Sequence, residues 1–436
     1  MRRWPLLACS IPFAFFVACA VNDATQFGGD GGGGSGGGTT GATGGGQTTG
    51  SGVGGGFDPV GSGGSTGSGT TCDAMPDEDK DQDGFSINQG DCNDCDANVN
   101  PNAVEVIVDP NMGQGGSGGV MEPADENCDG NVDEPPMVCD SGLAIDSADP
   151  LDAARAMGLC KMSAGNGEWG VVSAQWVLPD GSPAPNNPNY HLGHGILTAF
   201  GPNVNVQEGA AMFAVSSGTA RQPTDAGYQS VGGFDKGYTS AHPQGFPKES
   251  PSCPGITTGT PHDGTAVAIT IQAPSNAQGF SFDFNFYTYE WPGFVCSQYN
   301  DFFVASLNPI PMGQTDGNIS FDQLGNPVSV NNAFLEVCGC TGGPPCSAGG
   351  KSFTCALGNS ELQGTGFGLD TEFADHGATS WLQTAAPIGP GETFTMTWTT
   401  YDSGDGVLDS TTLVDNFQWT AEPGTTVGTN PIENPK

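Results

Sequence analysis

Alternation of apolar and polar side chains is the main regularity in the second half of the chain. Residues 265–271 alternate as Thr-Ala-Val-Ala-Ile-Thr-Ile, and after a Pro-Ser-Asn turn four phenylalanines occupy every second position of residues 280–286. Residues 393–401 and 411–419 repeat the two-residue period. Because successive side chains of a strand point to opposite faces of the sheet, these runs predict half-buried β-strands.

Helical periodicity is nearly absent from the same region. Only residues 149–159 look helical, with Asp149 as the cap and Pro150 in the first turn. Many short strands, one short helix and no βαβ alternation predict a mainly β fold, an antiparallel β-sandwich or jelly roll. We assign this domain to residues 139–423 and expect residues 424–436 to be a flexible tail.

The N-terminus carries an export signal. Arg2 and Arg3 precede an apolar run over residues 4–18, which is interrupted by prolines and is too short to span a membrane. The end of this run resembles a bacterial lipoprotein box, in which Cys19 would become the lipid-modified first residue of the mature chain.

Two alternatives to lipidation at Cys19 are open. Cys9 fits the box better but leaves almost no apolar centre, and it leaves an odd number of the 14 cysteines in the mature chain. Cleavage without lipidation is the other alternative. With Ala20 after the cysteine, we expect an exported lipoprotein anchored in the outer membrane or displayed at the cell surface, or else released.

Residues 20–71 consist almost entirely of Gly, Ser and Thr. Such a segment buries too little apolar surface to offset the entropy of ordering, so we predict a disordered linker. Its root-mean-square reach would be roughly 40 Å. The linker would hold the folded parts away from the membrane.

The charge balance excludes some partners. The formal net charge is −38, with only 10 Lys and Arg residues. Nucleic acid and anionic lipid both require basic protein surface, so neither is an expected partner. Divalent cations are favoured instead.

Acidic residues are concentrated in residues 72–138, which we assign to a separate metal-binding module. Seventeen acids and a single base, Lys80, lie between Cys72 and Glu134. The sequence Asp-x-Asp-x-Asp-Gly over residues 79–84 is the opening of a calcium loop, because alternate carboxylates of a tight turn converge. An EF-hand is excluded, since Gly90 stands where the closing Glu would be.

The calcium loop and the acidic segments after it follow one another through the module, at residues 79–84, 90–96, 100–105 and 126–134. This series resembles the MopE-type metal-binding repeat of bacterial surface proteins. The resemblance implies a small irregular domain wound around calcium and stapled by a disulfide between Cys92 and Cys128. The implied ligands are Asp79, Asp81, Asp83, Asp91, Asp94, Asp96, Glu105, Asp129 and Asp133, with Asp77, Asn93, Asp125 and Asn127 as further candidates.

Two cysteines of the module are additional to this pattern, and Cys72 and Cys95 could pair with each other. Copper is disfavoured because the module contains no His, and zinc because no cysteine set has zinc-finger spacing. A disordered acidic spacer is the alternative to a metal-bound module.

Several distinctive segments lie in residues 145–420: Gly-His-Gly-Ile-Leu at 193–197, Val-Ser-Ser-Gly at 215–218, and aromatic and acidic segments at 287–303, 377–394 and 401–416. With these segments the region resembles the choice-of-anchor L domain of bacterial surface and secreted proteins. The resemblance implies a sandwich-like domain displayed outside the cell. It implies a location more than a mechanism.

A second metal site could lie in this domain. Asp402, Asp405 and Asp409 share one Gly-containing loop, and Glu290, Asn300 and Asp301 flank another. Together they could hold a second calcium. Ordinary Asx turns explain the Asp-Ser-Gly-Asp-Gly sequence equally well, so both interpretations are open.

No active site is identifiable. His191 and His194 lack the following Glu of a zinc protease, and the remaining histidines are expected in loops. Ser216-Ser217-Gly218 is not a nucleophile elbow. The leading hypothesis is therefore a calcium-stabilised surface lipoprotein whose sandwich binds a glycan or a surface protein. A metal-sequestering surface protein and a secreted hydrolase are the alternatives.

Overall fold

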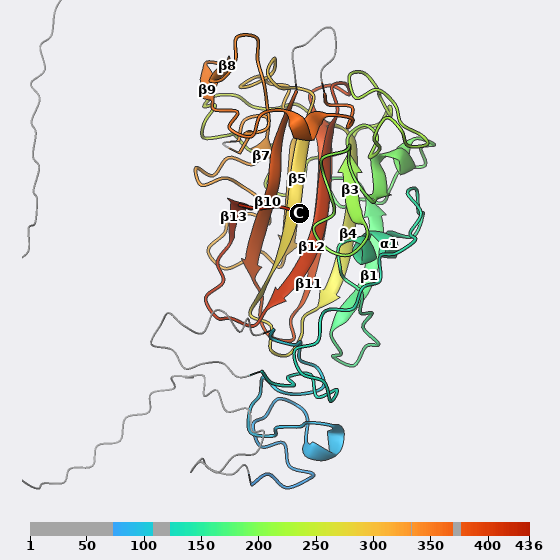
Figure 1. The fold of residues 1–436 in the computed structure, drawn as a ribbon, viewed down its shortest axis with the longest axis vertical. Coiled ribbons are helices and arrows are strands. Elements are labelled where there is room, and N and C mark those ends of the chain that lie inside the picture. Colours follow the sequence, from blue (N-terminus) through green and yellow to red (C-terminus); the bar gives the residue numbers. More distant parts are fainter. Residues whose placement is uncertain (1–72, 108–122, 333, 369–375) are drawn as a thin grey trace, which may run out of the picture. The chain divides into compact units, whose positions relative to one another are not determined.

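The computed structural model describes residues 73–107, 123–332, 334–368 and 376–436, which form a mainly β structure (Figure 1). Helical elements there are few and short: η1 (Ile87–Gln89), α1 (Pro150–Ala156), η2 (Tyr190–Gly193) and η3 (Ser360–Leu362). The expectations about residues 1–72, including the signal, Cys19 and the linker, fall outside the described residues.

Two antiparallel sheets make up the larger domain. The first has the order β1-β4-β11-β6-β7, with strands Gly170–Val177, Pro261–Gln272, Thr393–Ser403, Phe302–Asn308 and Val328–Ser329. The second has the order β13-β10-β5-β12-β3-β2, with strands Gly428–Pro431, Gly377–Pro387, Gly279–Thr288, Ser410–Thr420, Met212–Ser216 and His194–Leu197. A small hairpin pairs β8 (Cys346–Ala348) with β9 (Lys351–Phe353). The predicted antiparallel sandwich is confirmed.

The core lies between the two sheets and is built on the phenylalanines of β5. Each of these side chains is fully buried, and they reach strands of the facing sheet. Phe280 stacks on Phe394 of β11 with ring centroids 5.2 Å apart, and Phe282 meets Trp398 of β11 edge to face at 5.6 Å. The two-residue period of β5 therefore has the expected cause, since one face of the strand is the core of the sandwich.

The opposite face of β5 is partly covered. Tyr287 on this face packs edge to face on Phe200, with centroids 5.0 Å apart, and Phe367 lies against both rings. Nearer the other end of the strand, Asp283 is paired with Gln383 of β10 and with Asp415 of β12. This face of the six-stranded sheet thus changes from aromatic to polar along its length.

The structure differs from three expectations. Residues 428–431 of the expected flexible tail form β13, which pairs with β10. The helix is shorter than expected, because Met157 already leaves helical geometry and Gly158, with φ of 90°, follows. His262, which was expected in a loop, lies in strand β4.

Disulfides stabilise the loops of the domain. The bridges join Cys139 to Cys160, Cys253 to Cys296, Cys338 to Cys355 and Cys340 to Cys346. The last two are nested and close the loop that carries β8 and β9. None of the described helices has the length and apolar character needed to cross a membrane.

Candidate functional site

The first acidic loop of the module turns at Gly84. This residue has a φ of 100°, a conformation that favours glycine, and its amide donates to Asp79 Oδ2 at 3.0 Å. Asp79, Asp81 and Asp83 each bring one carboxylate oxygen within 4.8 Å of the others. The turn therefore gathers three carboxylates at one point.

A second group of carboxylates shares Asp81 with the first. Asp81, Asp91 and Asp94 also have ligand oxygens within 4.8 Å of one another. Asp91 and Asp94 are buried, with exposed fractions of 3% and 1%. Asp81 thus connects the opening loop to the segment around residues 91–94.

Four of the five carboxylates in these two groups follow one hydrogen-bonding pattern, and Asp79 is the exception. The Oδ1 atoms of Asp81, Asp83, Asp91 and Asp94 accept from the backbone amides of Asp83, Phe85, Asn93 and Lys80, respectively. Their Oδ2 atoms are buried and have no hydrogen-bond donor. One oxygen of each side chain is fixed by the backbone, and the other is left as an unsatisfied acceptor.

A third group lies at the end of the module. Glu105, Glu126 and Asp133 bring oxygens within 4.8 Å of one another. Glu105 accepts from the backbone amides of Asn127 and Asp133, which closes the C-terminal loop onto residue 105. The disulfide between Cys92 and Cys128 links this part of the module to the first two groups.

The structure brings together seven of the nine residues implied as ligands. Asp96 and Asp129 are in none of the three groups, and each accepts from a backbone amide two residues ahead, as an Asx turn does. Glu126 belongs to a group although sequence reasoning did not name it. Glu126 is the first residue of the 126–134 segment, next to the candidate Asn127, and this position could have identified it as a ligand. Cys95 is disulfide-bonded, and its expected partner Cys72 falls outside the described residues.

Burial and mutual repulsion disfavour the charged form of these acids. Burial raises the pKa of Asp81 to about 6, and the neighbouring Asp83 raises it further in the same direction. Burial likewise raises the pKa of Glu126 to about 7, with Glu105 contributing. Ion-free, these groups therefore resist full ionisation, whereas a bound cation would favour it.

A second concentration of acids is buried at one end of the sandwich. The register of β11 on β6 pairs Tyr401 with Phe302, so Asp402 and Asp301 follow as neighbours across the strands. Asp409 immediately precedes β12, where the Ser410 hydroxyl donates to Asp301 Oδ2 at 2.7 Å. Glu290 accepts from the Asp301 amide at 2.9 Å. Asp405, by contrast, is only half-buried and lies in the connecting loop.

A lysine that sequence reasoning missed lies beside these acids. Lys236 is 2% exposed, and its Nζ donates to the Ser216 carbonyl at 3.0 Å and to Thr265 Oγ1 at 2.9 Å. Burial lowers the pKa of Lys236 to about 8, against the opposing effect of Asp263, Asp409 and Asp402. No local motif marks this lysine, because its neighbours come from β3, β4 and β11.

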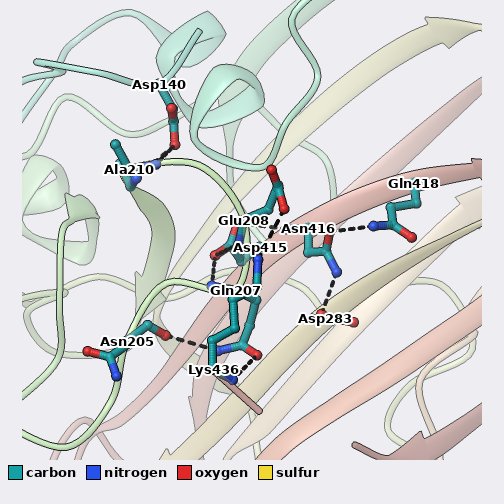
Figure 2. Close-up of polar contacts among 11 residues, drawn as sticks. Asp140, Asn205, Gln207, Glu208, Ala210, Asp283, Asp415, Asn416, Gln418 and Lys436 are labelled. Carbon is teal, nitrogen blue, oxygen red and sulfur yellow. Dashed lines mark hydrogen bonds and ion pairs between the residues drawn. The ribbon is translucent and has the colours of Figure 1, made fainter. Parts of the chain in front are cut away.

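A polar pocket of about 400 Å³ lies on the outer face of the six-stranded sheet, beside the C-terminal segment (Figure 2). On its floor the Asp283 carboxylate accepts from Gln383 Nε2 at 3.1 Å and from Asn416 Nδ2 at 2.8 Å. A bulge in β12 places Asn416 there with a φ of 53°. Other lining residues are Gln207, Glu208, Gln418, Asn430 and Lys436.

His194, Ser216 and Ser217, which were considered for catalysis, are held by packing and hydrogen bonds within the fold. His194 is buried and stacks on Trp176, with ring centroids 3.8 Å apart. The hydroxyls of Ser216 and Ser217 both donate to the Ser410 carbonyl. These contacts explain the three side chains by packing and strand pairing.

The domain with the two sheets can be compared with known families. Residues 248–416 match the model of the Choice-of-anchor L domain. The match runs from the segment before β4 into β12, so it contains the acids at the end of the sandwich. The resemblance of residues 72–134 to the MopE-type repeat stays a prediction.

Other comparisons add little. No curated protein matches this chain significantly. Among solved structures, the K2 cleaved adhesin domain of Lys-gingipain (Kgp) is similar at 11% identity and a TM-score of 0.23, over 59% of this chain and 93% of that one. A TM-score this low supports no inference about the present chain.

Proposed function

We propose that this chain is an exported surface lipoprotein in which calcium organises the acidic module and the module carries a ligand-binding β-sandwich. Cys19 would hold the lipid and the Gly-rich segment would serve as the tether. The choice-of-anchor match supports the location outside the cell, because that family name refers to attachment.

The observation that carries the proposal is the set of four unsatisfied Oδ2 atoms on Asp81, Asp83, Asp91 and Asp94. A buried acceptor without a donor costs about 1–3 kcal/mol, and more when charged. A hard cation satisfies several such oxygens at once, and calcium takes 6–8 oxygen ligands. The donor set of the module consists of oxygens only, which fits calcium and not copper or zinc.

Calcium titration of the purified protein tests the proposal. We expect calorimetry to detect binding, and the melting temperature to rise in calcium and fall in chelator. Equal melting temperatures in calcium and in chelator would contradict a structural role. Tight binding without any change in melting temperature would favour the alternative, a metal-sequestering protein.

The polar pocket of Figure 2 favours a carbohydrate as the ligand of the sandwich. Planar amides and carboxylates that converge in a shallow depression can each pair with adjacent hydroxyls of a sugar, and the volume of about 400 Å³ is within the range of small-ligand sites. Pro431 and Ile432 supply an apolar edge. The charge of Glu208 is balanced by Lys436, with Nζ 3.3 Å from Oε2.

A glycan array tests this assignment. We expect the protein to bind selected glycans and the Gln418→Ala variant to lose that binding, since the Gln418 amide lies at the pocket and donates to Asn416 Oδ1. Val172→Ala, on an exposed position of the other sheet, is the control. Binding that survives Gln418→Ala and an Asn416→Ala change would place the ligand elsewhere. Hydrolysis of an array glycan would favour the hydrolase alternative.

A further inference from the structure

The fully buried acids at the end of the sandwich have too few partners. Asp402 and Asp409 have exposed fractions of 0%, and no oxygen of either carboxylate accepts a hydrogen bond of normal geometry. Asp402 has weaker contacts with the Ser217 hydroxyl and with the Asp301 carboxyl. The side-chain oxygen of Asn300, which is 1% exposed, also lacks a donor. Five acceptor oxygens are thus buried together with Asp301, without donors to satisfy them.

These oxygens belong to segments that converge from both sheets. Asn300 and Asp301 precede β6 and lie opposite the end of β11, where the Asn300 amide donates to the Ser403 carbonyl at 3.4 Å. The Ser410 hydroxyl connects Asp301 to the start of β12. Since β11 and β12 belong to different sheets, the acids lie where the chain crosses from one sheet to the other.

The fold is shaped around the Asp409 carboxylate. A Cβ atom at Gly218 would lie 1.9 Å from Asp409 Oδ2, so no other residue fits at position 218 with Asp409 in place. The Asp409 backbone is fixed as well, because its carbonyl accepts from the Tyr289 amide and its own amide donates to the Val231 carbonyl. The carboxylate is therefore held in position without a donor of its own.

Protonation alone would not satisfy this arrangement. One proton shared between Asp301 and Asp402 still leaves the oxygens of Asp409 and Asn300 without donors. The buried ammonium of Lys236 donates to Ser216 and Thr265, and within the described residues it forms no ion pair with any of the acids. A divalent cation is the species that pairs with several oxygens at once and balances two negative charges.

We propose that Asn300, Asp301, Asp402 and Asp409 form a second divalent-cation site, inside the sandwich, that takes calcium. In the described part of the chain, the groups of three acids with oxygens within 4.8 Å of one another all lie in the acidic module, so Asp301, Asp402 and Asp409 would have to draw closer together when the ion binds. The neutral oxygen of Asn300 adds to these three carboxylates. Asp405 is left out of the set because it is only half-buried, and Glu290 because neither of its oxygens is among the buried acceptors without a donor.

A variant of Lys236 can distinguish a bound cation from shared protons as the counter-charge of these acids. The positive charge of Lys236 acts on Asp409 and Asp402 and would repel a bound cation. Lys236→Met should therefore strengthen cation binding at this site. If protons and Lys236 were the only counter-charges, the same change would weaken the fold whether or not calcium is present.

Terbium, an emissive calcium analogue, provides a readout in the whole protein. Tyr401 is adjacent to Asp402 and fully buried, and Trp291 is adjacent to Glu290, whereas residues 72–138 contain no Trp or Tyr. We expect terbium emission on excitation of the aromatic residues, and its loss when excess calcium is added. Asp81→Asn with Glu126→Gln, in the acidic module, should leave most of this emission.

Variants of the site decide the outcome. Asp402→Asn, which keeps the side-chain shape, should abolish the sensitised emission and lower the calcium content by one ion per chain in elemental analysis, and Lys236→Met should shift the terbium titration to lower concentration. Asp405→Asn is the matched control and should change neither.

Folding of each variant is checked by circular dichroism, and Asp409→Asn replaces Asp402→Asn if the latter is unfolded. Unchanged emission and ion content in a folded variant, or the absence of emission in the wild type, would overturn the proposal. The test is independent of calcium in the acidic module.

Discussion

At the scale of single residues, the acids of the module differ in whether water can reach the carboxylate oxygen that no backbone amide fixes. Asp96 and Asp129 accept from backbone amides and are accessible to water, so their charges need no ion. Asp81 and Asp94 have one oxygen fixed by an amide and the other buried without a donor. The second kind has the properties of a ligand held in place before the ion arrives.

Asp81 is common to two carboxylate groups, so its substitution should change the melting temperature in opposite directions with and without calcium. Asp81→Asn removes repulsion from the ion-free module and a ligand from the ion-bound one. We expect the variant to raise the melting temperature in chelator and to lower it in calcium. Differential scanning calorimetry under both conditions measures this. Asp129→Asn is the control, and equal effects of the two changes would contradict the assignment.

His194 predicts a pH dependence of stability that is unrelated to metals. Burial lowers the pKa of His194 to about 3, and the charges of Arg221 and Lys236 act in the same direction. As the pH falls from about 6.5 toward 3, the unfolded chain binds a proton that the folded chain excludes. The stability from the neutral ring is thus complete above pH 6.5 and is lost at lower pH, by up to about 1.4 kcal/mol per pH unit.

The His194→Gln variant should lack this loss. In urea denaturation at pH 7.5 and pH 5, we expect the wild type to lose more free energy of unfolding than the variant does. His191→Gln alters an exposed neighbour and should follow the wild type. Parallel losses in wild type and His194→Gln would show that His194 is protonated in the folded protein.

At the scale of secondary-structure elements, strands with alternating apolar and polar side chains were the predictable ones. Residues 265–271, 280–286, 393–401 and 411–419 lie within β4, β5, β11 and β12, whose apolar side chains pack in the core. The polar side chains of β5, such as Asp283 and Asn285, are buried as well, but their polarity preserves the alternation. β2 and β3 are buried on both faces and have no such alternation. β13 is a short edge strand rich in polar residues, and only its pairing with β10 defines it.

For the candidate sites too, the sequence predicts contacts within one local segment but not contacts between distant segments. The spacing of Asp79, Asp81 and Asp83 is local, so the sequence predicts their convergence. Lys236 and the opposition of Asp301 to Asp402 depend on strand register across the sheet, which no local pattern contains. Glu126 joins Glu105 only through closure of a loop.

The phenylalanines of β5 should contribute more to stability than any exposed apolar residue. Phe282 is fully buried and contacts both Phe284 and Trp398, so Phe282→Ala should lower the free energy of unfolding by about 3–5 kcal/mol. Val172→Ala, at an apolar position that is 49% exposed, should cost well under about 1 kcal/mol. Chemical denaturation in calcium measures both, and similar losses would contradict the placement of the core.

At the scale of the whole described structure, a few hydrogen bonds connect the acidic module to the sandwich. The side chain of Asn276, in the turn before β5, donates to the Val104 carbonyl at 2.8 Å and accepts from the Val104 amide at 3.0 Å. Asn102 bonds to the backbone of Trp169 and of Gly167 on the other side. Val104 is one residue before Glu105, a member of the third carboxylate group.

This connection predicts that calcium in the module also stabilises the sandwich. In the wild type we expect one calcium-dependent unfolding transition. Asn276→Ala removes both bonds to Val104 and leaves two backbone groups without partners, which should lower the free energy of unfolding in calcium by about 1–3 kcal/mol. It should also reduce the calcium-induced rise in the melting temperature of the sandwich, followed by near-ultraviolet circular dichroism, because Trp and Tyr occur in the sandwich and not in residues 72–138. Asn98→Ala, whose amide bonds Asp96 within the module, is the control. A sandwich transition that responds to calcium equally in Asn276→Ala and wild type would contradict a role of the Asn276–Val104 bonds in the coupling, because the bonds of Asn102 to Gly167 and Trp169 remain in the variant.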